Sequence, residues 1–155
     1  MGIETSCDET AVAVLDVTGF PAKPRVRVLA NVVASQVKLH AQFGGVVPHL
    51  AKREHQRNLV PVLLAALRES RIQNLESRRR RVGRSNVPDS RFKVLHSILE
   101  REPDLLAQMA SKVVPLRPPK VDAIAVTVGP GLAPALWVGV NFARALAYLW
   151  QMPII

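Results

Sequence analysis

The chain opens with the stretch Gly2-Ile-Glu-Thr-Ser-Cys-Asp-Glu-Thr-Ala-Val-Ala-Val-Leu-Asp16, in which a polar cluster separates two apolar runs. These runs have the composition of strands, so we predict strands at residues 2–5 and 10–17, joined by a tight turn. A third strand is predicted at residues 26–33, after a turn that holds one glycine and two prolines. Three consecutive strands with short connections predict an antiparallel meander.

A long helix and an atypical segment follow the meander. The helix is predicted from residue 48 to about residue 69, and Pro61 is expected to kink it or split it in two. Residues 71–119 then bring a basic stretch that includes Arg78-Arg79-Arg80-Arg81, two short helical patterns near 92–99 and 104–113, and three closing prolines. Because this segment has too few apolar residues for a core of its own, we expect a partly helical or disordered insertion into a compact fold.

The pattern after the insertion is that of a strand followed by a helix. An apolar run at residues 122–128 predicts a buried strand, and it ends in a Gly-Pro-Gly turn. A helix is predicted at residues 132–150, and residues 153–155 are typical of the start of another strand. A meander followed by such units predicts an α/β domain with a mixed sheet. A doubly wound sheet is the alternative, although its opening βαβ unit is not visible.

Composition limits the class of protein. The 155 residues, 48% of them hydrophobic, can bury a core, and no apolar run approaches the roughly 20 residues of a membrane span. Residues 71–120 hold 12 Lys/Arg and 5 Asp/Glu, so they carry most of the net charge of +9. A basic segment of this kind either attracts nucleic acid or forms a solvated loop, and the charge run favours the loop. The single Cys7 excludes an internal disulfide and a cysteine-based zinc site.

Two turns are candidate binding elements. In the first, from Thr5 to Thr10, backbone N–H groups and small hydroxyls can hold an anion, and a carboxylate can hold a cation or a water. An ordinary hairpin turn, in which Asp8 bonds local backbone, is the alternative interpretation. The second is the Gly-Pro-Gly turn, which precedes a helix whose N-terminus favours anions. It is neither a Walker A loop nor a dinucleotide fingerprint, because the required spacing is absent.

The histidines predict no metal site in this chain. Two of them are six residues apart on the long helix, which is not a spacing that places both on one face. We therefore expect each histidine to lie alone on the surface. The four are His40, His49, His55 and His96.

Three ordered motifs together resemble the tRNA threonylcarbamoyladenosine transferases, a family formerly called glycoproteases or O-sialoglycoprotein endopeptidases. Residues 2–10 resemble the opening motif, residues 35–55 the second motif, and residues 121–155 the third block. The resemblance covers residues 2–68 and 121–155, and residues 71–119 lie outside it. His49 and Lys52 stand where the family usually has Glu and Ser, which puts local loop contacts in doubt but not the fold.

The resemblance implies an actin/Hsp70/sugar-kinase-like fold with two ribonuclease-H-like lobes. Residues 1–155 would form the N-terminal lobe, and the C-terminal lobe would be absent from the chain. The implied reaction transfers the threonylcarbamoyl group from threonylcarbamoyl-adenylate to N6 of the adenosine at position 37 of tRNAs that read ANN codons. One divalent metal, Fe or Zn, is implied by the family with ligands outside this chain, so we expect the fragment to be inactive alone.

The resemblance also assigns roles to residues of this chain. Two acids would act in catalysis by positioning the acyl-adenylate or a metal-bound water, and these are Asp8 and Glu9. The residues that would line the anionic part of the adenylate are Thr5, Ser6, Gly129, Pro130 and Gly131. Candidate tRNA contacts are Lys38, Lys52 and Arg53.

Partners and location follow from the same resemblance. We expect tRNA as a partner, either a homodimer or pairing with a related subunit, and no membrane. The residues of the first two motifs resemble those of the bacterial and mitochondrial branch of the family. The basic insertion, by contrast, is untypical of compact bacterial members. We therefore expect a mitochondrial protein whose leader is absent from this chain, with a cytoplasmic location as the alternative. The alternative function is a non-catalytic relative that serves as a dimerisation or interaction module.

Overall fold

The structure is a computed structural model that describes residues 1–72 and 89–155. Its sheet consists of β1 (Gly2–Glu4), β2 (Glu9–Thr18), β3 (Arg25–Ser35) and β4 (Ala125–Val126), in the order β3-β2-β1-β4. The first three strands are antiparallel, and β4 runs parallel to β1. The predicted meander and the mixed sheet of an α/β fold are both confirmed.

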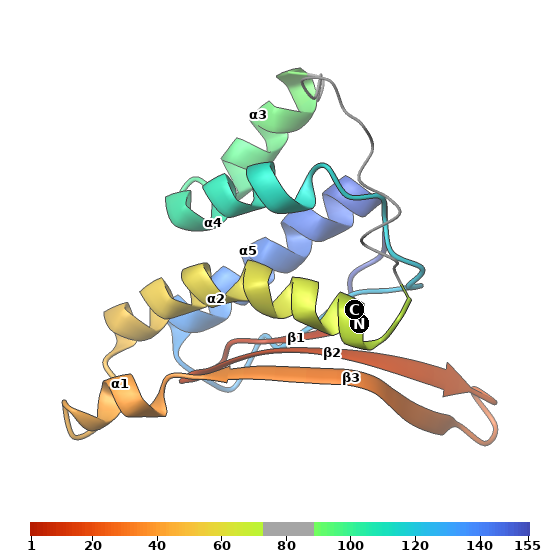
Figure 1. Ribbon diagram of the computed structural model, residues 1–155, viewed down its shortest axis with the longest axis horizontal. Coiled ribbons are helices and arrows are strands. Elements are labelled where there is room, and N and C mark those ends of the chain that lie inside the picture. Colours follow the sequence, from red (N-terminus) through yellow and green to blue (C-terminus); the bar gives the residue numbers. More distant parts are fainter. Residues whose placement is uncertain (73–88) are drawn as a thin grey trace.

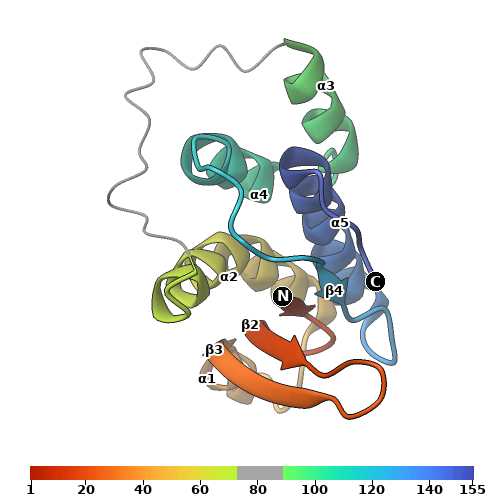
Figure 2. The same cartoon turned by 90° about the vertical axis from the view of Figure 1, so that its right-hand side faces the viewer.

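The two long helices lie on one face of this sheet (Figures 1 and 2). The helix α2 (Pro48–Glu69) packs on β2 and β3, and α5 (Ala133–Trp150) packs on β1 and β4. The other helical elements are α1 (Val37–Ala41), α3 (Asp89–Ile98), α4 (Pro103–Gln108) and the π-helical turn η1 (Met109–Val113). In the described part of the chain, no helix is long and apolar enough to cross a membrane.

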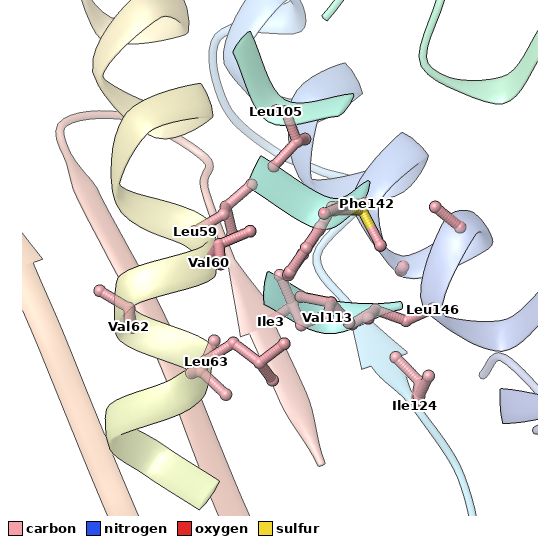
Figure 3. Close-up of a cluster of buried hydrophobic side chains, with 14 of the residues drawn as sticks. Ile3, Leu59, Val60, Val62, Leu63, Leu105, Val113, Ile124, Phe142 and Leu146 are labelled. Atoms are coloured by element: carbon pink, nitrogen blue, oxygen red, sulfur yellow. The ribbon is translucent and has the colours of Figure 1, made fainter. Parts of the chain in front are cut away.

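The hydrophobic core lies between the sheet and the helices. Strand side chains alternate between faces, so β2 directs Val12 and Val14 toward the helices. Figure 3 shows side chains of α2 and α5 meeting in this layer, among them Leu59, Leu63 and Phe142. Residues 89–113 also contribute to the cluster, and so they form part of the same core. Their contributions are Leu95, Leu99, Leu105, Met109 and Val113.

Pro61 does not split α2, which continues unbroken from Pro48 to Glu69. A proline inside a helix has no N–H, so the carbonyl four residues earlier, that of Arg57, loses its helical partner. In this structure Gln108 of α4 supplies the donor: its Nε2 lies 3.1 Å from the Gln56 carbonyl oxygen and 3.4 Å from that of Arg57. Of the two expected outcomes, a kink or a split, the split does not occur, and a side chain from the segment 71–119 lies within hydrogen-bond distance of the Arg57 carbonyl that the proline leaves without its helical donor.

Other boundaries differ from the sequence prediction in informative ways. The strand predicted at 122–128 is only Ala125–Val126, because its partner β1 is itself three residues long. The strand predicted at 153–155 begins as expected, with Ile154 forming a parallel bridge to Ile124. The short helix α1 was not predicted. The run Arg78-Arg79-Arg80-Arg81 lies outside the described residues.

Candidate functional site

The topology brings three loops to one end of the sheet. β1, β3 and β4 all end there, at Glu4, Ser35 and Val126, and β2 begins there. The loop after β3 meets the first turn where the Gln36 N–H donates to the Asp8 carbonyl oxygen at 2.8 Å. The loop after β4 meets it where the Leu132 N–H donates to the Ser6 carbonyl oxygen at 2.7 Å. In α/β sheets the loops after parallel strands are the usual place for ligands.

The two turns singled out in the sequence therefore lie against each other. The approach is so close that a Cβ on Gly131 would stand 2.5 Å from the Ser6 carbonyl oxygen, which only glycine avoids. On the next helical turn, the Thr5 hydroxyl donates to the Ala135 carbonyl oxygen at 3.0 Å. These contacts make the first turn and the start of α5 one continuous wall.

The predicted site residues have different exposures on this wall. Thr5 is fully buried, and its hydroxyl is used by α5, so it supports the turn from beneath. Ser6 and Asp8 are half-buried, and Glu9 is exposed. The second turn is exposed throughout, at Gly129, Pro130 and Gly131. The surface that a ligand can reach therefore includes Ser6, the two acids and the Gly-Pro-Gly backbone.

Glu4 belongs to the site although the sequence analysis did not select it. Its carboxylate accepts a hydrogen bond from the Ser6 N–H at 2.5 Å and another from the Thr127 hydroxyl. Burial raises the pKa of Glu4, but the hydrogen bonds from Ser6 and Thr127, with His55 nearby, outweigh burial and lower it overall. Glu4 is thus an ionised brace between the first turn and the end of β4. Strand alternation was the available signal, since it places Glu4 on the face opposite the buried Ile3.

His55 and His40 are buried, so the expectation of lone surface histidines was wrong for both. The Nε2 of His55 lies 3.1 Å from the Cys7 carbonyl oxygen, and its Nδ1 lies 2.8 Å from the Thr10 hydroxyl. Burial is the main cause that lowers the pKa of His55, although Glu4 and Asp8 oppose it. The missed signal was the spacing of four residues from Ala51 to His55 to Leu59, which places the imidazole on the apolar face of α2.

Cys7 does not have the properties of a nucleophile. It is half-buried, and burial together with the neighbouring Asp8 raises the pKa of its thiol. A thiol with a raised pKa stays protonated near neutral pH, and only the thiolate attacks. The backbone carbonyl of Cys7, and not its thiol, contributes to the site, because it forms a hydrogen bond with His55.

The three candidate tRNA contacts are not equivalent. Lys38 is exposed on α1, and Arg53 is half exposed beside Glu54. Lys52, by contrast, donates to the Arg101 carbonyl oxygen at 3.4 Å, and its ammonium lies 3.8 Å from the buried carboxylate of Glu102. Asn141 of α5 donates to the same carboxylate at 3.2 Å. Lys52 therefore links α2 to the segment before α4.

The described residues contain no set of side chains that could bind a metal ion. Across residues 1–72 and 89–155, no group of three or more His, Cys, Asp or Glu side chains could hold a metal ion. The buried histidines use their ring nitrogens in hydrogen bonds to protein groups. Among the residues that the structure describes, the chain offers no metal site of its own, and the divalent metal with ligands outside this chain stays a prediction.

Fold and site together define an α/β protein that presents two adjoining turns at the end of a mixed sheet. The family model described as tRNA N6-adenosine threonylcarbamoyltransferase matches residues 27–77 and 100–155, which is more than half of the chain. A curated tRNA N6-adenosine threonylcarbamoyltransferase from Thermomicrobium roseum is 38% identical over 155 residues. That alignment covers the whole of this chain but only 28% of the relative. The chain belongs to the tRNA N6-adenosine threonylcarbamoyltransferase family, whose members are transferases that act on tRNA.

The match also extends the resemblance. The matched ranges include residues 71–77 and 100–119, which the motifs alone left outside. This agrees with the packing of α4 and η1 into the common core. The part between the two matched ranges is residues 78–99.

Proposed function

We propose that this chain supplies one wall of the acyl-adenylate site in a tRNA threonylcarbamoyltransferase with an actin-like, two-lobed fold. The reaction would move the threonylcarbamoyl group from threonylcarbamoyl-adenylate to N6 of adenosine 37 in tRNAs that read ANN codons. The observation that carries the proposal is the contact between Gly131 and Ser6, because it joins the first turn and the turn after β4 into one surface. Because the chain spans 28% of its relative, we propose that the complete site needs further residues.

Each part of the wall has a proposed task. The exposed backbone of Gly129 and Gly131, at the start of α5, would face the anionic phosphate of the adenylate, since helix N-termini favour anions. The half-buried Ser6 hydroxyl would donate to the same group. Asp8 would orient the acyl group or an attacking amine, and Glu4 would hold the turn in place through its bonds to Ser6 and Thr127.

The test is a tRNA modification assay with the complete protein that contains this chain. Asp8→Ala should lower the rate of adenosine modification by about 100-fold, the scale of losing one positioned acid or base. Asp16→Ala is the matched control, because Asp16 is an exposed strand aspartate paired only with Arg27 at the surface among the described contacts. Equal modification rates in wild type and Asp8→Ala would overturn the role of Asp8.

A further inference from the structure

A chain of hydrogen bonds runs beneath the candidate site through three buried polar side chains. Gln36 contacts His55 and His40, with its Nε2 3.3 Å from the His55 Nδ1 and its Oε1 3.0 Å from the His40 Nε2. At one end, His55 meets the Cys7 carbonyl oxygen at 3.1 Å. At the other end, the Val47 N–H donates to the His40 Nδ1 at 3.3 Å. All three side chains are almost completely buried.

Which group donates and which accepts in each bond follows from the two backbone groups at the ends of this chain of hydrogen bonds. The Cys7 carbonyl oxygen can only accept, so the His55 Nε2 carries a hydrogen; the Val47 N–H can only donate, so the His40 Nδ1 accepts and the hydrogen of that ring lies on Nε2. The amide oxygen of Gln36 then accepts from the His40 Nε2. The amide nitrogen of Gln36 therefore donates to the His55 Nδ1, so this nitrogen, which also lies 2.8 Å from the Thr10 hydroxyl, carries no hydrogen. Both imidazoles are therefore neutral and protonated on Nε2, and no member of the chain lacks a partner along it.

The two ends of this chain lie in the loops that surround the site. Cys7 is part of the first turn, and Val47 closes the loop at residues 42–47, which contains the exposed Gly44 and Gly45. That loop joins α1 to α2. Apolar side chains would fill the same buried space with less dependence on exact geometry, whereas a fully satisfied polar chain fixes one arrangement.

We propose that Gln36, His40 and His55 are positioning residues that hold the glycine loop at 42–47 and the turn at Thr5–Asp8 in one fixed relation. The proposal deepens the proposed function, on which it rests, because the turn that they position is the wall of the acyl-adenylate site. None of the three has to contact the substrate. Their effect passes through the Cys7 carbonyl to Ser6 and Asp8, and through Val47 to the glycine loop.

The first test is nuclear magnetic resonance of the unmodified 155-residue chain with ¹⁵N-labelled histidine near pH 7.5. His40 and His55 should both give the signature of a neutral imidazole with the hydrogen on Nε2. The exposed His49 and His96 can be replaced by glutamine to simplify assignment. A hydrogen on Nδ1 of either buried ring, or a charged ring, would overturn the proposal.

The second test cuts the chain of bonds in the middle with Gln36→Leu. Amide exchange of Val47 should become about fivefold to tenfold faster, the scale of one hydrogen bond, and the His55 Nδ1 resonance and the amide resonances of residues 6–8 should shift. Gln56→Leu is the matched control, since Gln56 is a buried glutamine next to His55 that stands outside the chain of bonds. It should leave Val47 exchange and the His55 signature unchanged. Equal effects of the two variants would mean a merely structural role.

A third variant covers the case in which Gln36→Leu does not fold. Gln36→Glu keeps the acceptor for His40 but cannot donate to the His55 Nδ1, so it should draw a proton onto His55 and produce an imidazolium signature. An unchanged neutral His55 in this variant would contradict the assigned bonds. All three measurements need neither adenylate nor tRNA, so they fail or succeed independently of the modification assay that tests the proposed function.

Discussion

Gly139 of α5 lies directly over the side chain of Thr5, so closely that a Cβ on the glycine would overlap the threonine hydroxyl oxygen. Thr5 cannot turn away without loss, because its hydroxyl is fully buried and donates to the Ala135 carbonyl oxygen. This contact, with that of Gly131 on Ser6, sets how near the first turn comes to α5. Because Gly139 has no side chain, the first turn can approach α5 this closely, and this approach sets the geometry of the candidate site.

We predict that Gly139→Ala destabilises the fold by about 1–3 kcal/mol, the range for overpacking a filled core. Helix propensity alone would give the opposite sign, since alanine favours a helix interior by about 1 kcal/mol over glycine. Urea unfolding measures the difference. Gly45→Ala is the control, because a Cβ there meets nothing within 4 Å, and it should change stability by less than about 0.5 kcal/mol. In a Thr5→Ala background the cost of Gly139→Ala should largely vanish, and a cost that persists there would refute the assigned contact.

The charge of Glu4 should stabilise the fold only above a defined pH. Its pKa in the folded chain lies below the ordinary value of 4.5, so the ionised group contributes stability above pH 4.5 and loses it as the pH falls through the folded value. Glu4→Gln keeps the shape but not the charge, and it should cost about 1 kcal/mol at pH 7. Urea unfolding of both proteins between pH 7 and pH 3 should show this difference shrinking below pH 4.5. A difference independent of pH would contradict the role of the charge.

His55 should make the fold sensitive to mild acid. Burial and His40 lower its pKa from 6.5, while the Cys7 carbonyl, Glu4 and Asp8 raise it, and the net direction is downward. The unfolded chain therefore binds a proton first, and stability falls as the pH drops below 6.5 until the folded value is reached. The slope contributed by this group is at most about 1.4 kcal/mol per pH unit. In His55→Gln the slope of unfolding free energy between pH 7.5 and 5 should decrease, whereas in the exposed-site control His49→Gln it should stay as in the wild type.

The sequence was sufficient for the sheet and for most of the helices, because their apolar periodicity is strong and local. It also placed the two turns of the site, since Gly, Pro and small hydroxyls stand at the ends of predicted strands. It could not show that Thr5 lies beneath the wall, because this depends on Gly139, a residue 134 positions away whose role appears only when α5 packs on β1.

The errors at Pro61, His40 and His55 share one physical cause: a distant partner satisfies a polar group. Pro61 does not split α2, and Gln108 reaches the Arg57 carbonyl that the proline leaves without a helical donor. His40 and His55 are buried because Gln36, Cys7 and Val47 satisfy their nitrogens. Local rules treat a proline as a break and a histidine as a surface residue, and both rules fail where tertiary contacts supply the missing donor or acceptor.

The last prediction separates binding from stability among the candidate tRNA contacts. The Glu102 side chain is only 2% exposed, and Lys52→Met removes the cation beside its carboxylate. Arg53, by contrast, is a surface residue whose side chain is 50% exposed. Lys52→Met should therefore cost about 1–3 kcal/mol, below the usual range for a broken buried pair because Lys52 keeps 31% exposure and its contact is long. Arg53→Met should change stability by less than about 0.5 kcal/mol.

The binding readout has the reverse order if the proposed function holds. Removing a phosphate contact weakens tRNA binding and lowers the slope of log K against log salt by about 1. In the complete protein, Arg53→Met and Lys38→Met should each show this change, while Lys52→Met should show it only to the extent that the fold is lost. A matched pair of urea unfolding curves and salt-dependent tRNA titrations decides the matter. If Lys52→Met reduced the salt slope at full stability, Lys52 would be a tRNA contact and its ion pair with Glu102 would be dispensable.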